Sequence, residues 1–206
     1  MRTRIKICGM TRDEDVRAAV DAGADAIGLV FYPPSPRFLS VERACALARG
    51  VPPFVATVAL FVNAPAADVR TVIEGVRPSL LQFHGEETPE YCAQFGVPFL
   101  KACRMGPGVD ALKYLRPFSA AAGWLLDSHV AEYGGVGERF DWSLVPAELS
   151  RPLVLSGGLD PANVREAIRR VRPWAVDVSS GVEAAKGIKD AAKVAAFISE
   201  VRNADV

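Results

Sequence analysis

The sequence has no excess of charge of either sign and few of the residues that bind metals. Its 24 Lys and Arg residues balance 24 Asp and Glu residues, so we expect neither a basic surface for nucleic acid nor an acidic tail. The two histidines, His84 and His129, lack ligand spacing, and no Cys/His cluster accompanies them. We therefore predict no metal and no cofactor, and a small molecule as the binding partner.

Cysteines and long apolar runs are also scarce. The four cysteines contain no C-x-x-C pair, and 206 residues of which 50% are hydrophobic can bury a core without disulfides. No apolar stretch approaches the roughly 20 residues of a membrane span, and the first residues lack the apolar core of a secretory signal. We expect one soluble, cytoplasmic domain over residues 1–206, which acts as a monomer or a homodimer, with no membrane partner.

Short apolar runs alternate with helical patterns along the whole chain. Strands are expected at 5–8, 26–31, 54–62, 80–83, 99–105, 124–126, 151–155 and 174–178. A helical stretch follows each of them, weak at 109–115 and reduced to one turn near 141–142. Eight such units in about 200 residues predict a single (β/α)8 barrel with abbreviated helices after strands five and six. An open doubly wound sheet would be expected to carry a glycine-rich fingerprint at 8–11, and none is present.

Helix ends follow recognisable signals. Thr11 and Glu14 predict a capping box for the first helix, and Ser40, Thr88 and Asp160 are expected to begin later ones. The last helix, from about residue 190, is expected to bury a stripe made of Ala191, Val194, Ala195 and Ile198.

Polar and glycine residues gather where the predicted strands end, and in a barrel these ends form one rim around one pocket. The Gly157-Gly158 and Ser180-Gly181 turns follow strands seven and eight, where barrels commonly bind phosphate through backbone N–H groups. Gly135, in the glycine cluster at 134–137, can add a third arm. Each turn taken alone is also compatible with a simple tight connection.

Cys8, His84 and Asp127 share this rim, and Cys8 with Asp127 makes an acid/base pair possible. One group would remove a carbon-bound proton while the other protonates an oxygen. Lys6 has the same strand parity as Cys8, and Asp177 on strand eight has the matching parity, which predicts a buried Lys6–Asp177 ion pair. The lysine of this pair can also lower the pKa of the thiol. Taken singly, a cysteine such as Cys8 is more often inert packing, and an aspartate such as Asp127 is more often a helix cap.

Arg37 follows three prolines in a stiff loop after strand two. Its guanidinium can clamp a carboxylate or lie against an aromatic ring.

With these residues identified, the sequence resembles the phosphoribosylanthranilate isomerase family, barrel enzymes of tryptophan biosynthesis. The similarity covers nearly the whole chain and is carried in order by the motifs Lys6-Ile7-Cys8-Gly9, Gly28-Leu29-Val30-Phe31, Ser35-Pro36-Arg37, Leu81-Gln82-Phe83-His84-Gly85, Leu126-Asp127-Ser128, Phe140-Asp141-Trp142, Ser156-Gly157-Gly158-Leu159 and Asp177-Val178-Ser179-Ser180-Gly181-Val182-Glu183.

The resemblance implies an Amadori rearrangement of a phosphosugar, N-(5-phosphoribosyl)anthranilate. Asp127 would protonate the ring oxygen and Cys8 would take the C2' proton. Arg37 would hold the anthranilate, His84 and Asp177 would also contact the substrate, and the glycine turns would hold the phosphate. The family usually has threonine where Val136 stands here.

Three rivals stay open. An epimerase on the same barrel would need clustered histidines, and an indole-glycerol-phosphate synthase would need further catalytic Lys and Glu residues. A non-catalytic phosphate-binding subunit remains the alternative outside enzymes.

Overall fold

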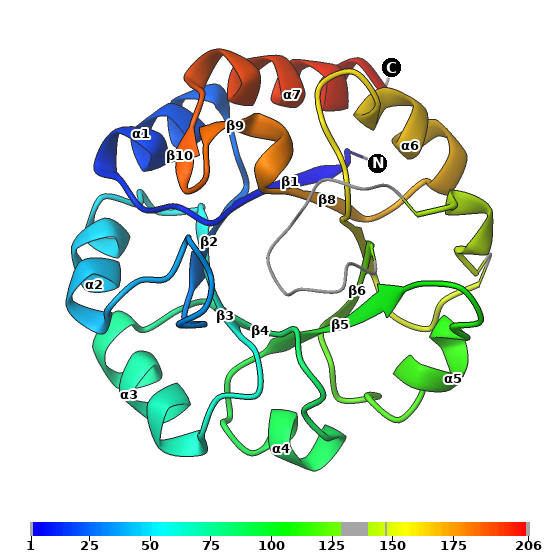
Figure 1. Cartoon of the computed structure of the whole chain (residues 1–206), viewed down its shortest axis with the longest axis horizontal. Coiled ribbons are helices and arrows are strands. Elements are labelled where there is room, and N and C mark those ends of the chain that lie inside the picture. Colours follow the sequence, from blue (N-terminus) through cyan, green and yellow to red (C-terminus); the bar gives the residue numbers. More distant parts are fainter. Residues whose placement is uncertain (1, 129–139, 147, 205–206) are drawn as a thin grey trace.

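The computed structural model describes residues 2–128, 140–146 and 148–204, and it confirms the predicted barrel. Eight parallel strands pair in sequence order into a closed barrel, and β1 pairs with β8 to close it (Figure 1). The strands are β1 (Arg4–Cys8), β2 (Ala26–Val30), β3 (Ala56–Phe61), β4 (Leu80–Phe83), β5 (Phe99–Met105), β6 (Gly123–Ser128), β7 (Leu153–Leu155) and β8 (Ala175–Val178).

The helices form a ring outside the barrel (Figure 1). They are α1 (Asp13–Ala22), α2 (Val41–Arg49), α3 (Ala66–Val76), α4 (Pro89–Ala93), α5 (Ala111–Leu115), α6 (Val164–Val171) and α7 (Ala191–Ala204), with 3-10 turns η1 (Trp142–Leu144) and η2 (Ser180–Val182). The abbreviated helices after β5 and β6 are confirmed as the short α5 and η1. The helix after β4 is also short, which the sequence did not indicate. No helix among the described residues has the length and apolarity needed to cross a membrane.

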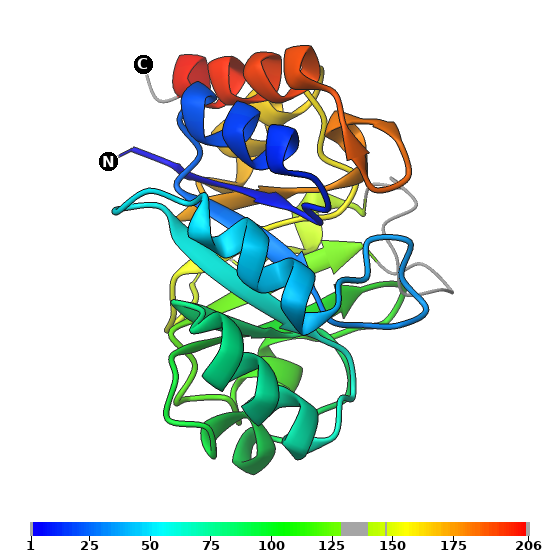
Figure 2. The ribbon, with the colours of Figure 1, turned by 90° about the vertical axis from the view of Figure 1, so that its left-hand side faces the viewer.

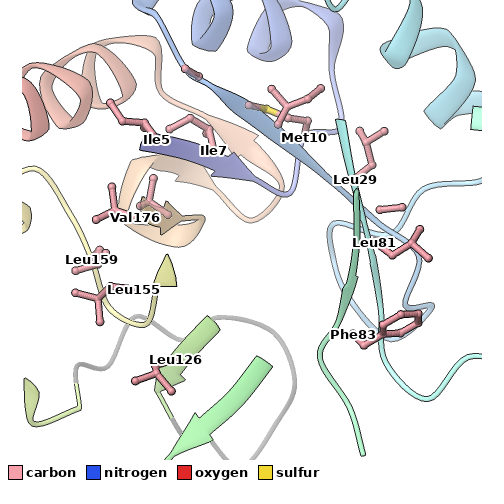
Figure 3. Packing of buried hydrophobic residues seen from close by; sticks show 14 of the residues in the cluster. Ile5, Ile7, Met10, Leu29, Leu81, Phe83, Leu126, Leu155, Leu159 and Val176 are labelled. Atoms are coloured by element: carbon pink, nitrogen blue, oxygen red, sulfur yellow. The ribbon is translucent and has the colours of Figure 1, made fainter. Parts of the chain in front are cut away.

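Side chains alternate between the barrel interior and the layer beneath the helices, as the period of a strand requires. Figure 3 shows Ile5 and Ile7 of β1 beside Val176 of β8, in the larger core between barrel and helices. A smaller cluster fills the barrel interior. Its members are Leu100, Ala102, Leu125, Val154 and Ala175. Because the interior is packed, space for a ligand is left at the barrel mouth.

Several expected helix signals hold and others do not. Ser40 and Thr88 accept hydrogen bonds from Arg43 N and Tyr91 N, as predicted caps should. The Thr11 capping box is wrong, because the Thr11 hydroxyl donates instead to the Gly187 carbonyl of a neighbouring hairpin and α1 has no side-chain cap.

Two expectations at the C-terminal part of the chain were also wrong in detail. α6 begins at Val164 rather than directly after Asp160, because the Asp160 carboxylate accepts from Ala162 N and Asn163 N and holds a turn first. On α7 the expected Ala191 and Ala195 are exposed. The buried stripe of α7 is Val194, Phe197, Ile198 and Val201.

A two-stranded hairpin of β9 (Glu183–Ala185) and β10 (Ile188–Lys189) follows η2 and was not predicted. Figure 2 shows this hairpin, in orange, and the N-terminus at opposite ends of the barrel. The hairpin therefore lies at the carboxyl ends of the strands, beside the barrel mouth.

A buried ion pair joins the connections after β3 and β4 to β5. Lys101 Nζ lies 2.9 Å from Glu87 Oε2 and also donates to the Gly85 carbonyl, and the two charged side chains are 0% and 2% exposed. The Glu87 carboxylate accepts from the backbone N–H groups of Asn63 and Gly85. These bonds satisfy both buried charges and fix the backbone next to His84.

We predict that Glu87→Gln lowers the free energy of unfolding by about 3–5 kcal/mol, because it leaves the Lys101 charge buried without a counter-charge. Urea denaturation measures the loss. Glu166→Gln is the matched control, since Glu166 and Arg170 are 65% and 54% exposed and 4.0 Å apart, and it should cost less than about 1 kcal/mol. Equal small losses in the two variants would contradict the structural role of Glu87.

Candidate active site

A cavity opens at the carboxyl ends of the strands, and every barrel strand or the residues directly after it contribute to its wall. The sequence-predicted residues that line it are Cys8, Arg37, His84, Asp127, Gly157, Gly158, Asp177 and Ser180. Gly181 is not part of the lining: a Cβ there would lie 1.9 Å from the Leu159 carbonyl oxygen, so its backbone packs directly on the turn after β7. Gly135 lies outside the described residues.

The predicted ion pair between Lys6 and Asp177 is confirmed. Lys6 Nζ donates to Asp177 Oδ2 at 2.8 Å, and both side chains are 5% exposed. Burial alone would lower the pKa of Lys6, but the negative charge of Asp177 and the Cys8 sulfur together raise it, so Lys6 stays cationic beside the thiol.

Cys8 is buried at the tip of β1, next to Gly28 of β2. A Cβ on Gly28 would lie 2.5 Å from the Cys8 sulfur, so only glycine leaves room for it. The expected effect of Lys6 is confirmed in direction, because its charge and its hydrogen bond lower the pKa of Cys8, but burial outweighs it. Burial raises the pKa of Cys8 above its ordinary value, although Lys6 and, more weakly, Lys189 lower it. The sulfur is therefore a strong base whose anion depends on nearby cations.

Three polar side chains form a hydrogen-bonded row, from β4, from the residue directly after β4 and from β6. Gln82 Nε2 lies 3.1 Å from His84 Nδ1, and His84 Nε2 lies 3.0 Å from Asp127 Oδ2. The other oxygen of Asp127 accepts from the backbone N–H of Ser128 at 2.9 Å. The sequence analysis missed Gln82, although it shares the inward parity of His84 two residues later.

The hairpin holds Arg37 at the opposite wall. The Glu183 carboxylate accepts from Arg37 Nε and one terminal guanidinium nitrogen, each at 2.7 Å, and from Lys189 Nζ at 2.9 Å. Burial alone would raise the pKa of Glu183, but the two cations hold it below its ordinary value. Lys189 was missed because nothing in its local pattern marks it as buried.

Positive φ angles shape the turn after β7. Gly157 and Gly158 have φ of 86° and 64°. A Cβ on Gly157 would lie 2.3 Å from the Ser128 backbone nitrogen, so this turn presses against the end of β6. Among the described residues no group of three His, Cys, Asp or Glu side chains could hold a metal ion.

Comparison with known proteins gives one consistent result. A family profile described as N-(5'phosphoribosyl)anthranilate (PRA) isomerase matches residues 5–200. The N-(5'-phosphoribosyl)anthranilate isomerase of Leptothrix cholodnii is 60% identical over 99% of this chain and 93% of that protein.

Solved structures agree. A phosphoribosyl anthranilate isomerase in complex with reduced 1-(o-carboxyphenylamino)-1-deoxyribulose 5-phosphate is 41% identical, with a TM-score of 0.88, over 98% of this chain and 99% of the other. Monomers generated from the dimeric enzyme of Thermotoga maritima are 38% identical, with a TM-score of 0.84 and the same coverage.

We predict that Lys6→Met shifts the pH midpoint for alkylation of Cys8 upward by about one pH unit or more, because it removes the main cation that favours the thiolate. Iodoacetamide labelling followed over pH by peptide mass spectrometry resolves Cys8 from the other cysteines. Lys6→Arg, which keeps the charge, should restore most of the shift, and exposed Lys113→Met is the control. An unchanged midpoint in Lys6→Met would show that Lys6 does not act on the thiol.

Proposed function

Because this chain belongs to the N-(5'-phosphoribosyl)anthranilate isomerase family, we propose that it converts N-(5-phosphoribosyl)anthranilate to 1-(2-carboxyphenylamino)-1-deoxyribulose 5-phosphate, a step of tryptophan biosynthesis, with Asp127 as acid and Cys8 as base. The observation that carries these roles is that the two side chains, from β6 and β1, line the same cavity. They can therefore reach one bound sugar from different walls.

The proposed reaction begins with Asp127 in its acid form. Asp127 gives its proton to the ring oxygen, the bond from that oxygen to C1' breaks, and the nitrogen lone pair forms a protonated Schiff base. The Cys8 thiolate then takes the proton from C2', and the electron pair of that bond moves toward the nitrogen to give an enolamine. Tautomerisation of the enolamine gives the aminoketone. Over one turnover Cys8 must lose one proton and Asp127 must regain one.

The charged groups near Cys8 suit this task. Burial makes the sulfur a stronger base when it is ionised, and the Lys6 ammonium favours the ionised form. Asp177 Oδ1, which has no hydrogen-bond partner in the described part of the chain, is the atom we assign to a sugar hydroxyl. This keeps the predicted substrate contact of Asp177 while its other oxygen binds Lys6.

We assign the phosphate to the turns at Gly157, Gly158 and Ser180, and the anthranilate to Arg37. The two orientations considered for Arg37 can now be weighed. Its in-plane donors already bind Glu183 in a bidentate pair, so a flat face of the guanidinium is better suited than its edge to meet the substrate. An aromatic ring stacked on that face fits anthranilate. The predicted contact of His84 with substrate stays a prediction, since both of its ring nitrogens have protein partners.

A reducing compartment follows from the proposed base, and we propose the cytoplasm. Cys8 and the other three cysteines are free thiols in the structure. Oxidation of Cys8 would remove the thiolate on which proton abstraction depends.

We predict that Asp127→Asn and Cys8→Ser each lower kcat at least about 10²-fold, because each loses a proton-transfer group whose help is given mainly in the transition state. KM should change modestly. Loss of anthranilate-adduct fluorescence on adding substrate reports the reaction, and a non-catalytic phosphate-binding barrel would leave the signal unchanged. The exposed Asp21→Asn and the α2 variant Cys45→Ser are matched controls that should keep wild-type rates. Near-normal kcat in either test variant would reassign that role.

We propose a homodimer rather than a monomer, with Phe54 at its interface. Phe54 precedes β3, at the end of the barrel opposite the cavity, and its side chain is fully exposed on a backbone with φ of 73°. A bulky residue held outward at positive φ is uncommon and suggests a contact. The related Thermotoga maritima enzyme is described as dimeric.

Phe54→Asp should convert the dimer to a monomer, because a buried unpaired carboxylate is costly at an apolar contact. Sedimentation equilibrium gives the mass of wild type and variant. Leu144→Asp, which changes an exposed apolar residue of η1, is the control and should leave the mass unchanged. A wild type that is monomeric at all concentrations would return the choice to the monomer.

A further inference from the structure

The row formed by Gln82, His84 and Asp127 contains a residue with no role in the mechanism above. Gln82 is 0% exposed, and its Oε1 has no hydrogen-bond partner among the residues that the structure describes. Its Nε2 is 3.1 Å from His84 Nδ1. A fully buried amide that makes one bond through one end is expensive to keep in a core, so its position beneath His84 calls for a reason.

Neutral imidazole carries one N–H and one lone pair, so the two neighbours of His84 must be complementary. In one arrangement the Gln82 amide N–H donates to Nδ1, and Nε2–H donates to an Asp127 carboxylate. In the other the amide is rotated by half a turn, Oε1 accepts from Nδ1–H, and Nε2 accepts from the acid form of Asp127. An amide occupies the same volume in both orientations, so both arrangements fit these heavy-atom positions. They differ by one proton, and it is the proton that Asp127 must give and regain.

We propose that Gln82 is a positioning residue that acts through His84, and that its amide rotates with each change in the protonation of Asp127. The proposal rests on the acid role assigned to Asp127 above. When Asp127 is protonated, the rotated amide holds the tautomer of His84 that accepts from it. When Asp127 has given its proton, the first orientation holds the tautomer that donates to the carboxylate. The amide thereby stabilises both states that one turnover requires.

The surroundings of His84 hold its ring in place, so a change at Asp127 alters the position of the ring proton and not the position of the ring. Glu87 and Lys101 bind the N–H and the carbonyl of Gly85, the residue after His84, and so fix the backbone there. The ring has protein partners at both nitrogens. A change in the protonation of Asp127 therefore changes the tautomer of His84 and the orientation of the Gln82 amide, while both side chains keep their positions.

Other charged groups also lie near Asp127. Arg104 of β5 is its register neighbour, and Asp177 of β8 and Cys8 of β1 line the same cavity. Lys6 is paired with Asp177. Gln82 itself carries no charge, so its effect comes through the tautomer of His84 and can be separated from theirs.

Histidine NMR tests the proposal without using activity. The chain has only two histidines, so a 15N-histidine-labelled sample gives two sets of ring signals, and His84→Asn assigns them. In wild type we expect His84 to pass from the Nε2–H tautomer at high pH to the neutral Nδ1–H tautomer as Asp127 becomes protonated. An imidazolium ring with protons on both nitrogens would instead place the added proton on His84 and contradict the proposal. Asp127→Asn should abolish this change, and Gln82→Glu, whose ionised carboxylate can only accept, should hold Nδ1–H for as long as that carboxylate is ionised. One tautomer at all pH values in wild type would overturn the proposal while leaving the isomerase assignment intact.

Kinetics supply the second readout. Gln82→Met, similar in shape but unable to bond Nδ1, should lower kcat at least about tenfold with KM changed less than about twofold, and should move the limb of the kcat pH profile on which Asp127 titrates. Exposed Gln94→Met is the matched control and should match wild type. Thermal unfolding checks that each variant is folded. A Gln82→Met enzyme with wild-type kcat and pH profile would refute the role of Gln82, whereas an inactive wild type would instead refute the proposed function.

Discussion

The buried contact between Lys6 and Asp177 is the interaction on which the site depends. It joins residues 171 positions apart and crosses the seam where β1 meets β8, so it forms only when the barrel is closed. A buried ion pair is tolerated only when its two charges meet in good geometry, which ties the geometry of the barrel mouth to correct closure. The same ammonium lies beside the Cys8 sulfur and favours its anion. The Lys6 ammonium therefore contributes both to closure of the barrel and to ionisation of Cys8.

A second pattern is that charged side chains in and beneath the cavity wall are paired with one another, so that they do not attract ligand charges on their own. Glu183 binds the in-plane donors of Arg37 and also the Lys189 ammonium. Lys101 and Glu87 satisfy one another below the connection that carries His84. Because these cations are already paired, the cavity can recognise its ligand by shape, backbone donors and ring stacking as well as by net charge. The hairpin of β9 and β10 is the element that makes this possible for Arg37.

The eight strands of the barrel and the Lys6–Asp177 pair could be predicted from the sequence. Buried parallel strands are continuous apolar runs, so all eight were found, and parity alone placed Lys6 opposite Asp177. The ends were less certain: the run at 54–62 is longer than β3, because apolar residues continue into the connection that carries Phe54. The β9–β10 hairpin is too short to leave a pattern. Gln82 and Lys189 were missed because their importance comes from partners distant in the chain.

The Glu87 carboxylate binds two separate connections of the barrel, and this has a consequence for engineering. It holds the N–H of Asn63 after β3 and that of Gly85 after β4, so two successive connections depend on one side chain that neither can replace. A new loop grafted after β3 or after β4 would disturb the other connection. It would also disturb the backbone that positions His84. These two segments can be exchanged only as a pair, together with the lysine that anchors them.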